Sequence, residues 1–223
     1  LFPYTTLFRS PGTNPRPDGE FGKTLSISSD GKTLAVGYVN APGAGFSNNL
    51  ENLSYESAGA IYMFEKSVVD DRWFKSKVTT TPGSQSEQFN NIHYNVITEY
   101  EQYTSDNFGK SLALSGDGKT LAVTSKSSGL LYIYSRESGS WCKTKVFTTP
   151  VSLADFGKTV CITEDGGTIA VSCSKKDTDA NGNLVNMPKV AIFKKQNNVW
   201  SFTETRSQEH TSELQSRSAI SYA

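Results

Sequence analysis

The feature that most constrains this chain is an internal repeat. A sixteen-residue segment occurs in variant form at 21–36, 108–123 and 156–171. Each copy begins with Phe-Gly and carries an Asp-Gly pair near its middle. In the second copy, Leu112 and Leu114 precede this pair and Leu121 and Val123 follow it, each alternating with small or polar residues. Alternation with a period of two predicts strands. The Asp-Gly pair between them predicts a tight hairpin, because Gly tolerates positive φ and Asp bonds to its own backbone.

Two further strands are predicted after each hairpin. Third strands are predicted at 60–64, 130–134 and 189–193, and fourth strands are predicted to open at Trp73, Trp141 and Trp200. The second and third Phe-Gly pairs lie 48 residues apart, and a four-stranded unit repeating at this length is typical of a β-propeller blade. The sequence therefore predicts an all-β fold, a β-propeller fragment of about three four-stranded antiparallel blades.

The predicted organisation follows the repeat. It comprises an inter-blade connection at 11–20, blade 1 at 21–80, an inter-blade insertion at 81–107, blade 2 at 108–150 and blade 3 at 156–205. Between their second and third strands, blades 1 and 3 have long predicted loops, at 37–59 and 174–188, whereas blade 2 has a short one. Loops of variable length on a constant frame are where propellers carry binding function.

The two ends differ in character from the repeats. Residues 1–10 and 206–223 resemble translated sequencing adapters, and we expect them to be artefacts that take no part in the fold. Because closed propellers have about four to eight blades, three repeats predict a fragment with two uncovered blade faces.

The order Phe-Gly, Asp-Gly-x-Thr-Leu-Ala-Val, an aromatic third strand and a Trp resembles the FG-GAP repeat. The resemblance covers roughly residues 19 to 205 and implies a propeller like the headpiece of integrin α chains and of many cell-surface proteins. WD40 repeats fit less well, because no Gly-His or Trp-Asp signature is present, and Kelch repeats fit less well, because no Gly-Gly pair closes a second strand. The calcium loop of FG-GAP repeats lies in the first hairpin. Here Asp30, Asp117 and Asp165 stand in tight turns instead, so the family's calcium sites cannot be carried over.

One segment outside the hairpins has the spacing of a calcium loop. Asp177, Asp179 and Asn181 follow the D-x-D-x-N-G pattern, in which alternating oxygen ligands surround a hard cation. The later ligand positions hold Val185 and Pro188, so an ordinary polar turn is the alternative. No cofactor other than this possible calcium ion is expected.

Two loop segments are candidates for surface recognition. The insertion contains Tyr94, Tyr100 and Tyr103 among amides, a composition common where surfaces bind partners or sugars. A loop packed on the propeller rim is the alternative. Asn52 begins an Asn-Leu-Ser glycosylation sequon in the long loop of blade 1.

The cysteines and histidines suggest no catalytic or metal centre. Cys142, Cys161 and Cys173 are expected to be small buried hydrophobes. The hairpin register places Cys161 opposite Ala170, out of disulfide reach of Cys173. His93 is the only histidine outside the adapter-like ends, which disfavours the common zinc sites. No Ser/His/Asp set can be assembled, and we expect a non-enzymatic protein.

The charge and hydropathy of the sequence limit the kinds of partner that we expect for this protein. The formal net charge is zero without a basic stripe, so nucleic acid is not expected as a partner. The sequence contains no run of 18 apolar residues, so we expect no transmembrane helix in it. We therefore expect an extracellular or cell-surface recognition scaffold that binds protein or glycan through its loops. The alternatives are a fragment of a propeller hydrolase or lyase, with its catalytic residues in other blades, and an intracellular WD40-like platform.

Overall fold

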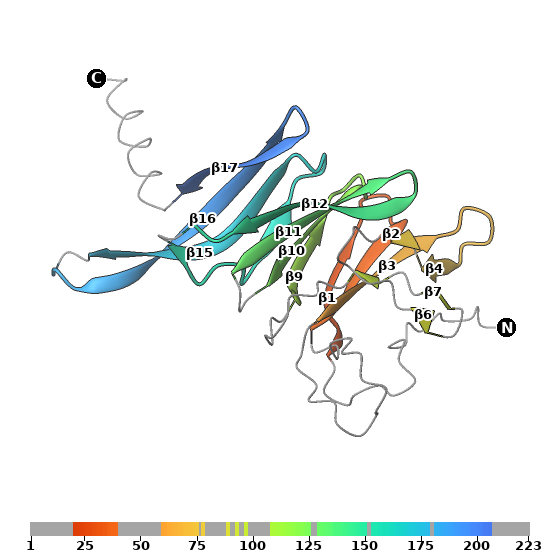
Figure 1. Cartoon of the computed structure of the whole chain (residues 1–223), viewed down its shortest axis with the longest axis horizontal. Coiled ribbons are helices and arrows are strands. Elements are labelled where there is room, and N and C mark those ends of the chain that lie inside the picture. Colours follow the sequence, from red (N-terminus) through yellow and green to blue (C-terminus); the bar gives the residue numbers. More distant parts are fainter. Residues whose placement is uncertain are drawn as a thin grey trace, which may run out of the picture.

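The computed structural model describes residues 20–39, 59–75, 77–78, 88–89, 92–93, 96–97, 108–125, 129–150, 153–178 and 181–206. None of these residues is helical, and the described part holds no helix that could cross a membrane. Three mainly antiparallel sheets lie side by side in chain order, from the orange strands through the green to the blue (Figure 1). The all-β class and the β-propeller fragment of about three blades are confirmed.

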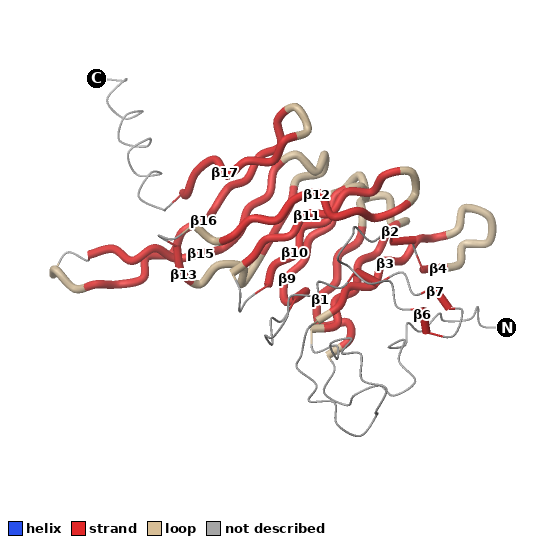
Figure 2. The backbone as a smooth tube through the Cα atoms, viewed as in Figure 1, coloured by secondary structure: helices blue, strands red, loops and turns tan. Residues whose placement is uncertain are grey.

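Each sheet is a meander of consecutive strands (Figure 2). Blade 1 consists of β1 (Phe21–Ile27), β2 (Thr33–Tyr38), β3 (Ala60–Lys66) and β4 (Trp73–Lys75). Blade 2 consists of β9 (Phe108–Leu114), β10 (Thr120–Ser125), β11 (Leu130–Glu137) and β12 (Ser140–Thr148). Blade 3 consists of β13 (Leu153–Ala154), β14 (Val160–Ile162), β15 (Thr168–Thr178), β16 (Leu184–Gln196) and β17 (Val199–Arg206).

Short strands between blades 1 and 2 join both sheets. β5 (Lys77–Val78) pairs in parallel with β12, and β8 (Val96–Ile97) pairs with β3 beyond the end of β4. Two further strands, β6 (Gln88–Phe89) and β7 (Ile92–His93), pair only with each other. The outer strand of blade 1 is thus shared between β4 and β8, whereas the single strand β12 pairs along the whole of β11.

The core lies between the blades rather than inside any one of them. Leu112 and Leu114 of blade 2 share one buried cluster with Ala35, Ile61 and Met63 of blade 1. The opposite face of blade 2 shares a second cluster with blade 3, whose members include Ala113, Ala122, Leu131, Ile133, Val160, Ile169 and Phe193. Both faces of blade 2 are therefore covered, which explains why apolar or small residues occupy both sides of its strands.

The Phe residues of the repeat anchor these clusters. Phe108 is 1% exposed and packs edge-on against Tyr132 and Tyr134 of the third strand. Phe21 meets Tyr38 and Tyr62 in a similar way, and Phe156 meets Phe193. Edge-to-face aromatic pairs add roughly 0.5–1.5 kcal/mol beyond the area they bury. The aromatic part of the repeat is accordingly structural.

Two sequence-based predictions are wrong in part. The loop predicted at 174–188 is a continuation of the β15–β16 hairpin as far as the Thr178–Leu184 pair, because ladder pairing satisfies the backbone N–H and C=O groups of its polar residues. Cys161 does lie opposite Ala170, but it is exposed and Cys142 is half-buried, so of the three cysteines predicted to be buried only Cys173 is. Cys161 points to the face of blade 3 that no other described blade covers. All three cysteines are free.

Candidate functional site

The candidate site is a polar groove between blades 2 and 3, with a volume of about 490 Å³. It lies at the end of the blades that carries the Asp-Gly turns and the outer β11–β12 and β16–β17 hairpins. Its charged lining residues include Asp117, Lys119, Arg136, Lys145, Asp165 and Lys195. Residues from two sheets, far apart in sequence, therefore meet in one place.

The turn that follows the first strand of each blade explains the position of the two aspartates. The Ser115 hydroxyl donates to Asp117 Oδ1 at 2.5 Å, and the Lys119 amide donates to the same oxygen at 3.0 Å. In blade 3, the Thr163 hydroxyl and the Gly167 amide donate to Asp165 Oδ1 at 2.5 and 2.9 Å. Both carboxylates are therefore acceptors that close their own turns.

These turns also connect the blades to one another. The Ser29 amide donates to the Gly116 carbonyl at 2.9 Å, and the Asp117 amide donates to the Glu164 carbonyl at 3.0 Å. The Ser29 hydroxyl adds a bond of 2.8 Å to Glu164 Oε2. The turns of three successive blades are thus linked by hydrogen bonds, which fixes the inner wall of the groove.

The hydrogen bonds change the acidity of the turn carboxyls. The Thr163 hydroxyl, and after it the Gly167 amide, lower the pKa of Asp165 below its ordinary value. Ser28, followed by the Lys32 amide, lowers the pKa of Asp30 in the same way. A general acid or base working near neutral pH needs a carboxyl whose pKa is raised instead. Asp165 is therefore suited to holding the turn rather than to transferring protons.

We expect the substitution Thr163→Val to raise the pKa of Asp165 toward its ordinary value. The reason is that valine keeps the shape of threonine but cannot donate a hydrogen bond to the carboxylate. NMR titration of the side-chain carboxyl would measure the change, with the exposed Thr178→Val as the control. An unchanged pKa in Thr163→Val would contradict the assigned cause.

The sign of the stability effect follows from the lowered pKa. A carboxyl whose pKa is lower in the folded state adds stability above its unfolded pKa and loses that contribution as the pH falls through its folded pKa. Thr163→Val should therefore lose less stability than the parent chain on acidification through that window. Denaturant unfolding at a series of acidic pH values would measure this difference.

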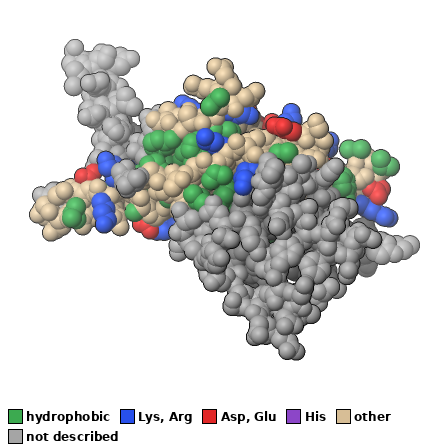
Figure 3. Space-filling view, viewed as in Figure 1, with side chains coloured by type: hydrophobic (Ala, Val, Ile, Leu, Met, Phe, Trp, Pro, Cys, Tyr) green, Lys and Arg blue, Asp and Glu red, His purple; other side chains and the backbone are tan. Residues whose placement is uncertain are grey.

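The cationic side chains of the groove differ in their pairing. Arg136 bonds to Glu65 of blade 1 at 2.5 Å, so it links blades 1 and 2. Within the described part of the chain, Lys119, Lys145 and Lys195 form no ion pair. Lys145 Nζ lies 5.3 Å from the centre of the Phe147 ring. Three ammonium groups therefore remain available to an anionic group. Lysine and arginine side chains are distributed over the described part of the surface in Figure 3.

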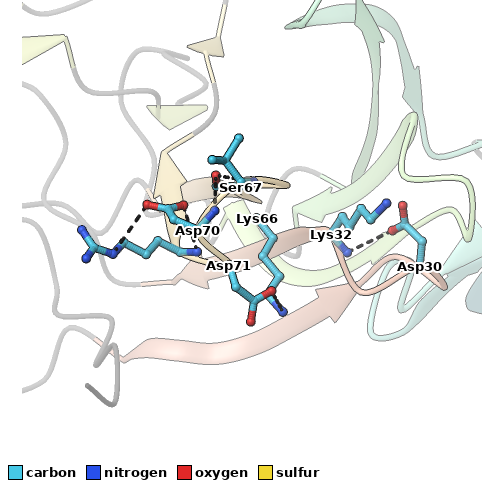
Figure 4. A network of polar contacts seen from close by, with 8 residues as sticks. Asp30, Lys32, Lys66, Ser67, Asp70 and Asp71 are labelled. Carbon is cyan, nitrogen blue, oxygen red and sulfur yellow. Dashed lines mark hydrogen bonds and ion pairs between the residues drawn. The ribbon is translucent and has the colours of Figure 1, made fainter. Parts of the chain in front are cut away.

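Blade 1 shows how such cations are otherwise neutralised. Around its β3–β4 turn, Lys66 pairs with Asp71 at 2.6 Å and Arg72 with Asp70 at 3.5 Å (Figure 4). The Asp70 carboxyl has a lowered pKa, chiefly because Ser67 hydrogen-bonds to it. The outer turn of blade 1 thus carries its own counter-charges, which sets it apart from the groove between blades 2 and 3.

Trp200 borders the groove but is 5% exposed, and its indole Nε1 is buried without a hydrogen-bond partner among the described residues. Trp141, at the equivalent place in blade 2, has the same orphaned Nε1. Because the feature repeats with the blade, it belongs to the packing of the repeat and gives no separate indication of a ligand.

The residues proposed from the sequence stand apart from this groove or cannot be placed. Tyr94, Tyr100, Tyr103, Asn52 and Asp179 lie outside the described residues. Asp177 pairs with Val185 near the tip of the β15–β16 hairpin, and its Oδ1 accepts from the Thr178 amide. Asn181 lies in the turn between these strands. Among the described residues, no group of three or more His, Cys, Asp and Glu side chains is placed to hold a metal ion.

Sequence reasoning missed the lysines of the groove. Lys119 follows an Asp-Gly turn, Lys145 lies within a predicted fourth strand and Lys195 follows a predicted third strand. A comparison of equivalent positions across the three copies could have placed all three near one end of the blades. It could not have shown that they are left without ion-pair partners, because pairing depends on contacts between sheets.

No protein-family model matches the chain, and no curated protein matches its sequence. Among solved structures, it is similar to a protein from Lactobacillus plantarum at 11% identity and a TM-score of 0.46, covering 82% of this chain and 40% of that one. It is similar to the β-propeller domain of Myceliophteria thermophila Cps50 (Swd1) at 14% identity and a TM-score of 0.38, covering 80% and 39%. It is also similar to a periplasmic gluconolactonase of Pseudomonas aeruginosa at 11% identity and a TM-score of 0.27, covering 82% of this chain and 84% of that one.

The chain spans about two fifths of the length of the first two of these proteins. The similar structures thus include a β-propeller domain and a gluconolactonase. At these identities and TM-scores, the likeness says nothing about ligand or activity.

Proposed function

We propose that this chain is part of a non-enzymatic recognition scaffold, an FG-GAP-type propeller of a cell-surface or secreted protein. Its groove between blades 2 and 3 binds a protein or glycan ligand that presents carboxylates. The surface setting follows from the resemblance of the repeats to FG-GAP sequences. The groove adds a defined place for recognition to the loops considered from the sequence.

The observation that carries this proposal is the set of three lysines that form no ion pair with any other described residue. Lys119, Lys145 and Lys195 line one groove, whereas Lys66 and Arg72 at the β3–β4 turn of blade 1 are paired with neighbouring aspartates. Cationic side chains that converge without internal partners are suited to an anionic ligand, because complementary potentials guide association and fix the register of the complex.

The state of the acidic residues supports binding rather than catalysis. Asp117 and Asp165 accept hydrogen bonds within their own turns, and the pKa of Asp165 is lowered. The Asp165 carboxyl is therefore not prepared for proton transfer, and both aspartates line the groove. A ligand carboxylate would approach the lysines, away from the oxygen atoms that the turns already occupy.

We expect the triple variant Lys119→Gln/Lys145→Gln/Lys195→Gln to weaken binding of an acidic ligand by about tenfold. Exposed ion pairs contribute roughly 0.2–1 kcal/mol each, and about 1.4 kcal/mol corresponds to a factor of ten. The probe is a fluorescent oligoglutamate peptide, with oligoglutamine as its neutral counterpart. Fluorescence anisotropy at low and high salt would measure the affinity, because screening weakens exposed charge pairs.

A matched control keeps the same change in net charge. Lys175, Lys176 and Lys189 lie on β15 and β16 outside the groove, so Lys175→Gln/Lys176→Gln/Lys189→Gln should retain most of the affinity. Equal losses in both triple variants would show that binding depends only on net charge. No binding of the acidic peptide by the parent chain would refute the groove as its site.

A further inference from the structure

Each blade carries a cation near the end of its third strand, and the three cations occupy equivalent places in the repeat. They are Lys66, Arg136 and Lys195. The backbone amide of each donates to the carbonyl of the residue that precedes the second strand of its own blade, at 2.8 Å in blades 1 and 2 and at 2.9 Å in blade 3. The ion pairs of the three side chains can therefore be compared directly.

Two of these three cations have a carboxylate partner. Lys66 Nζ lies 2.6 Å from Asp71 Oδ1 of its own β3–β4 turn (Figure 4). Arg136 Nη2 lies 2.5 Å from Glu65 Oε2, which belongs to the preceding blade. Lys195 is the exception, because it forms no ion pair with any other described residue. The third of these equivalent places therefore lacks its carboxylate within the described part of the chain.

The repeat positions explain why Lys195 lacks a partner. Glu65 lies opposite Thr33 between the third and second strands of blade 1. Ser135 lies opposite Thr120 at the equivalent place in blade 2. Blade 2 therefore presents a hydroxyl to blade 3 where blade 1 presents a carboxylate to blade 2. The β16–β17 turn supplies no replacement, because both of its residues are asparagines.

Ser135 and Lys195 lie on the faces that blades 2 and 3 turn toward each other. Ser135 stands two residues after Ile133 and therefore shares its face of the sheet, as Lys195 does with Phe193. Ile133 and Phe193 both belong to the buried cluster between these two blades. Ser135 and Lys195 themselves are half-buried and line the groove. They therefore repeat, between blades 2 and 3, the arrangement of the ion pair between blades 1 and 2.

We propose that the ligand of this groove is an acidic protein segment, one of whose side-chain carboxylates binds between Ser135 and Lys195. It takes the place that Glu65 occupies beside Arg136. The inference rests on the proposed function and assigns the anion of the ligand to one point in the groove. There the Lys195 ammonium pairs with the carboxylate, and the Ser135 hydroxyl donates a hydrogen bond to it. Hydrogen bonds to an ionised acceptor are about twice as strong as neutral ones.

Glu65 itself indicates what kind of group carries the carboxylate. Its carboxylate reaches Arg136 on a slender methylene stem, and only 14% of the side chain is exposed. Aspartate and glutamate side chains of a partner present the group in the same way. A uronic acid carries its carboxylate directly on the sugar ring, so a ring would have to enter between the sheets. The arrangement therefore fits an acidic protein segment better than an acidic glycan.

A double-mutant cycle tests the assigned place without any ligand. Ser135→Glu restores a carboxylate at the equivalent of Glu65, and Lys195→Gln removes the cation. Denaturant unfolding should show that Lys195→Gln raises the unfolding equilibrium constant about two- to fivefold more when Ser135→Glu is present, the range of an exposed ion pair. The absence of such coupling would overturn the proposal. Thr178→Glu, at the exposed far end of β15, is the control and should show no coupling with Lys195→Gln.

The introduced carboxylate should also compete with an acidic peptide. We expect Ser135→Glu to weaken binding of the fluorescent oligoglutamate peptide by about tenfold, because the new group occupies Lys195 and repels the peptide. Thr178→Glu changes the net charge equally and should keep the affinity within about twofold of the parent chain. Fluorescence anisotropy measures both affinities, and far-ultraviolet circular dichroism checks that each variant is folded. Equal losses in the two variants would show that net charge alone acts, which contradicts the proposal.

A comparison of two probes separates this inference from the proposed function. Oligogalacturonate with the same number of carboxylates as the oligoglutamate is the acidic glycan probe, and the parent chain should bind the peptide several-fold more tightly. Tighter binding of oligogalacturonate would overturn the assignment of a protein segment while leaving a groove that binds carboxylates. Binding of neither probe would refute the groove as a binding site, and this inference with it. The double-mutant cycle depends on neither probe, so the two failures are distinguishable.

Discussion

Replacing Trp141 with alanine is expected to lower the free energy of unfolding by about 3–5 kcal/mol, the usual cost of removing a fully buried aromatic side chain. Trp141 is completely buried in the cluster shared by blades 1 and 2. The cavity would open at the contact between two sheets, so both blades would lose packing. Denaturant unfolding followed by circular dichroism would measure the loss.

Two controls make this prediction specific. Trp141→Phe should be far milder, within about 1 kcal/mol of the parent chain, because it removes a buried indole N–H that has no partner among the described residues, and such a group costs roughly 1–3 kcal/mol. Trp73→Ala should also cost less than Trp141→Ala, since Trp73 is only half-buried. Equal losses at Trp73 and Trp141 would contradict the assigned core.

The second large effect is expected at Gly59, which precedes β3 and lies close to the backbone of Phe108 in blade 2. Its φ is +82°, and a Cβ at this position would lie 2.1 Å from the Phe108 carbonyl oxygen and 2.9 Å from the Phe108 nitrogen. These are backbone atoms of the neighbouring blade, so they cannot move aside alone. Gly59→Ala should cost about 2–5 kcal/mol, combining left-handed backbone strain with overpacking.

Gly139 provides the matched control for this substitution. Its φ is +78°, close to that of Gly59, but no atom lies within 4 Å of a Cβ built there. Gly139→Ala should therefore cost only the backbone strain, about 1–2 kcal/mol. Denaturant unfolding of both variants isolates the contribution of the blade contact. Equal losses would show that the approach of Gly59 to Phe108 does not limit stability.

Much of the fold could be predicted because the relevant signals are local. The alternation around Leu112 and Leu121 and the Asp-Gly pairs predicted the first hairpin of each blade, and the structure has these hairpins. The pairing of Cys161 with Ala170 was predicted from the position of the turn alone. Such features depend on a few neighbouring residues, so one sequence suffices to find them.

The candidate site could not be predicted in the same way. Lys119, Lys145 and Lys195 lie in three separate strand or turn segments, and only the packing of blade 3 on blade 2 brings them to one groove. The residues favoured from the sequence, such as Tyr94 and Asp179, lie outside the described part of the chain and remain predictions. No pattern in the sequence indicates which charged side chains of different sheets will form ion pairs.

The sequence by itself determined the repeated unit, its strands and the turns that close them, because these depend on period-two alternation and on residues that tolerate or cap a turn. Tertiary structure decided which of the equivalent faces are buried. Leu25 and Leu112 occupy the same place in the repeat, yet the first is 61% exposed and the second 7%. The difference arises because a side chain is buried only when another sheet packs against its face. Only the arrangement of the sheets shows which faces have such a neighbour.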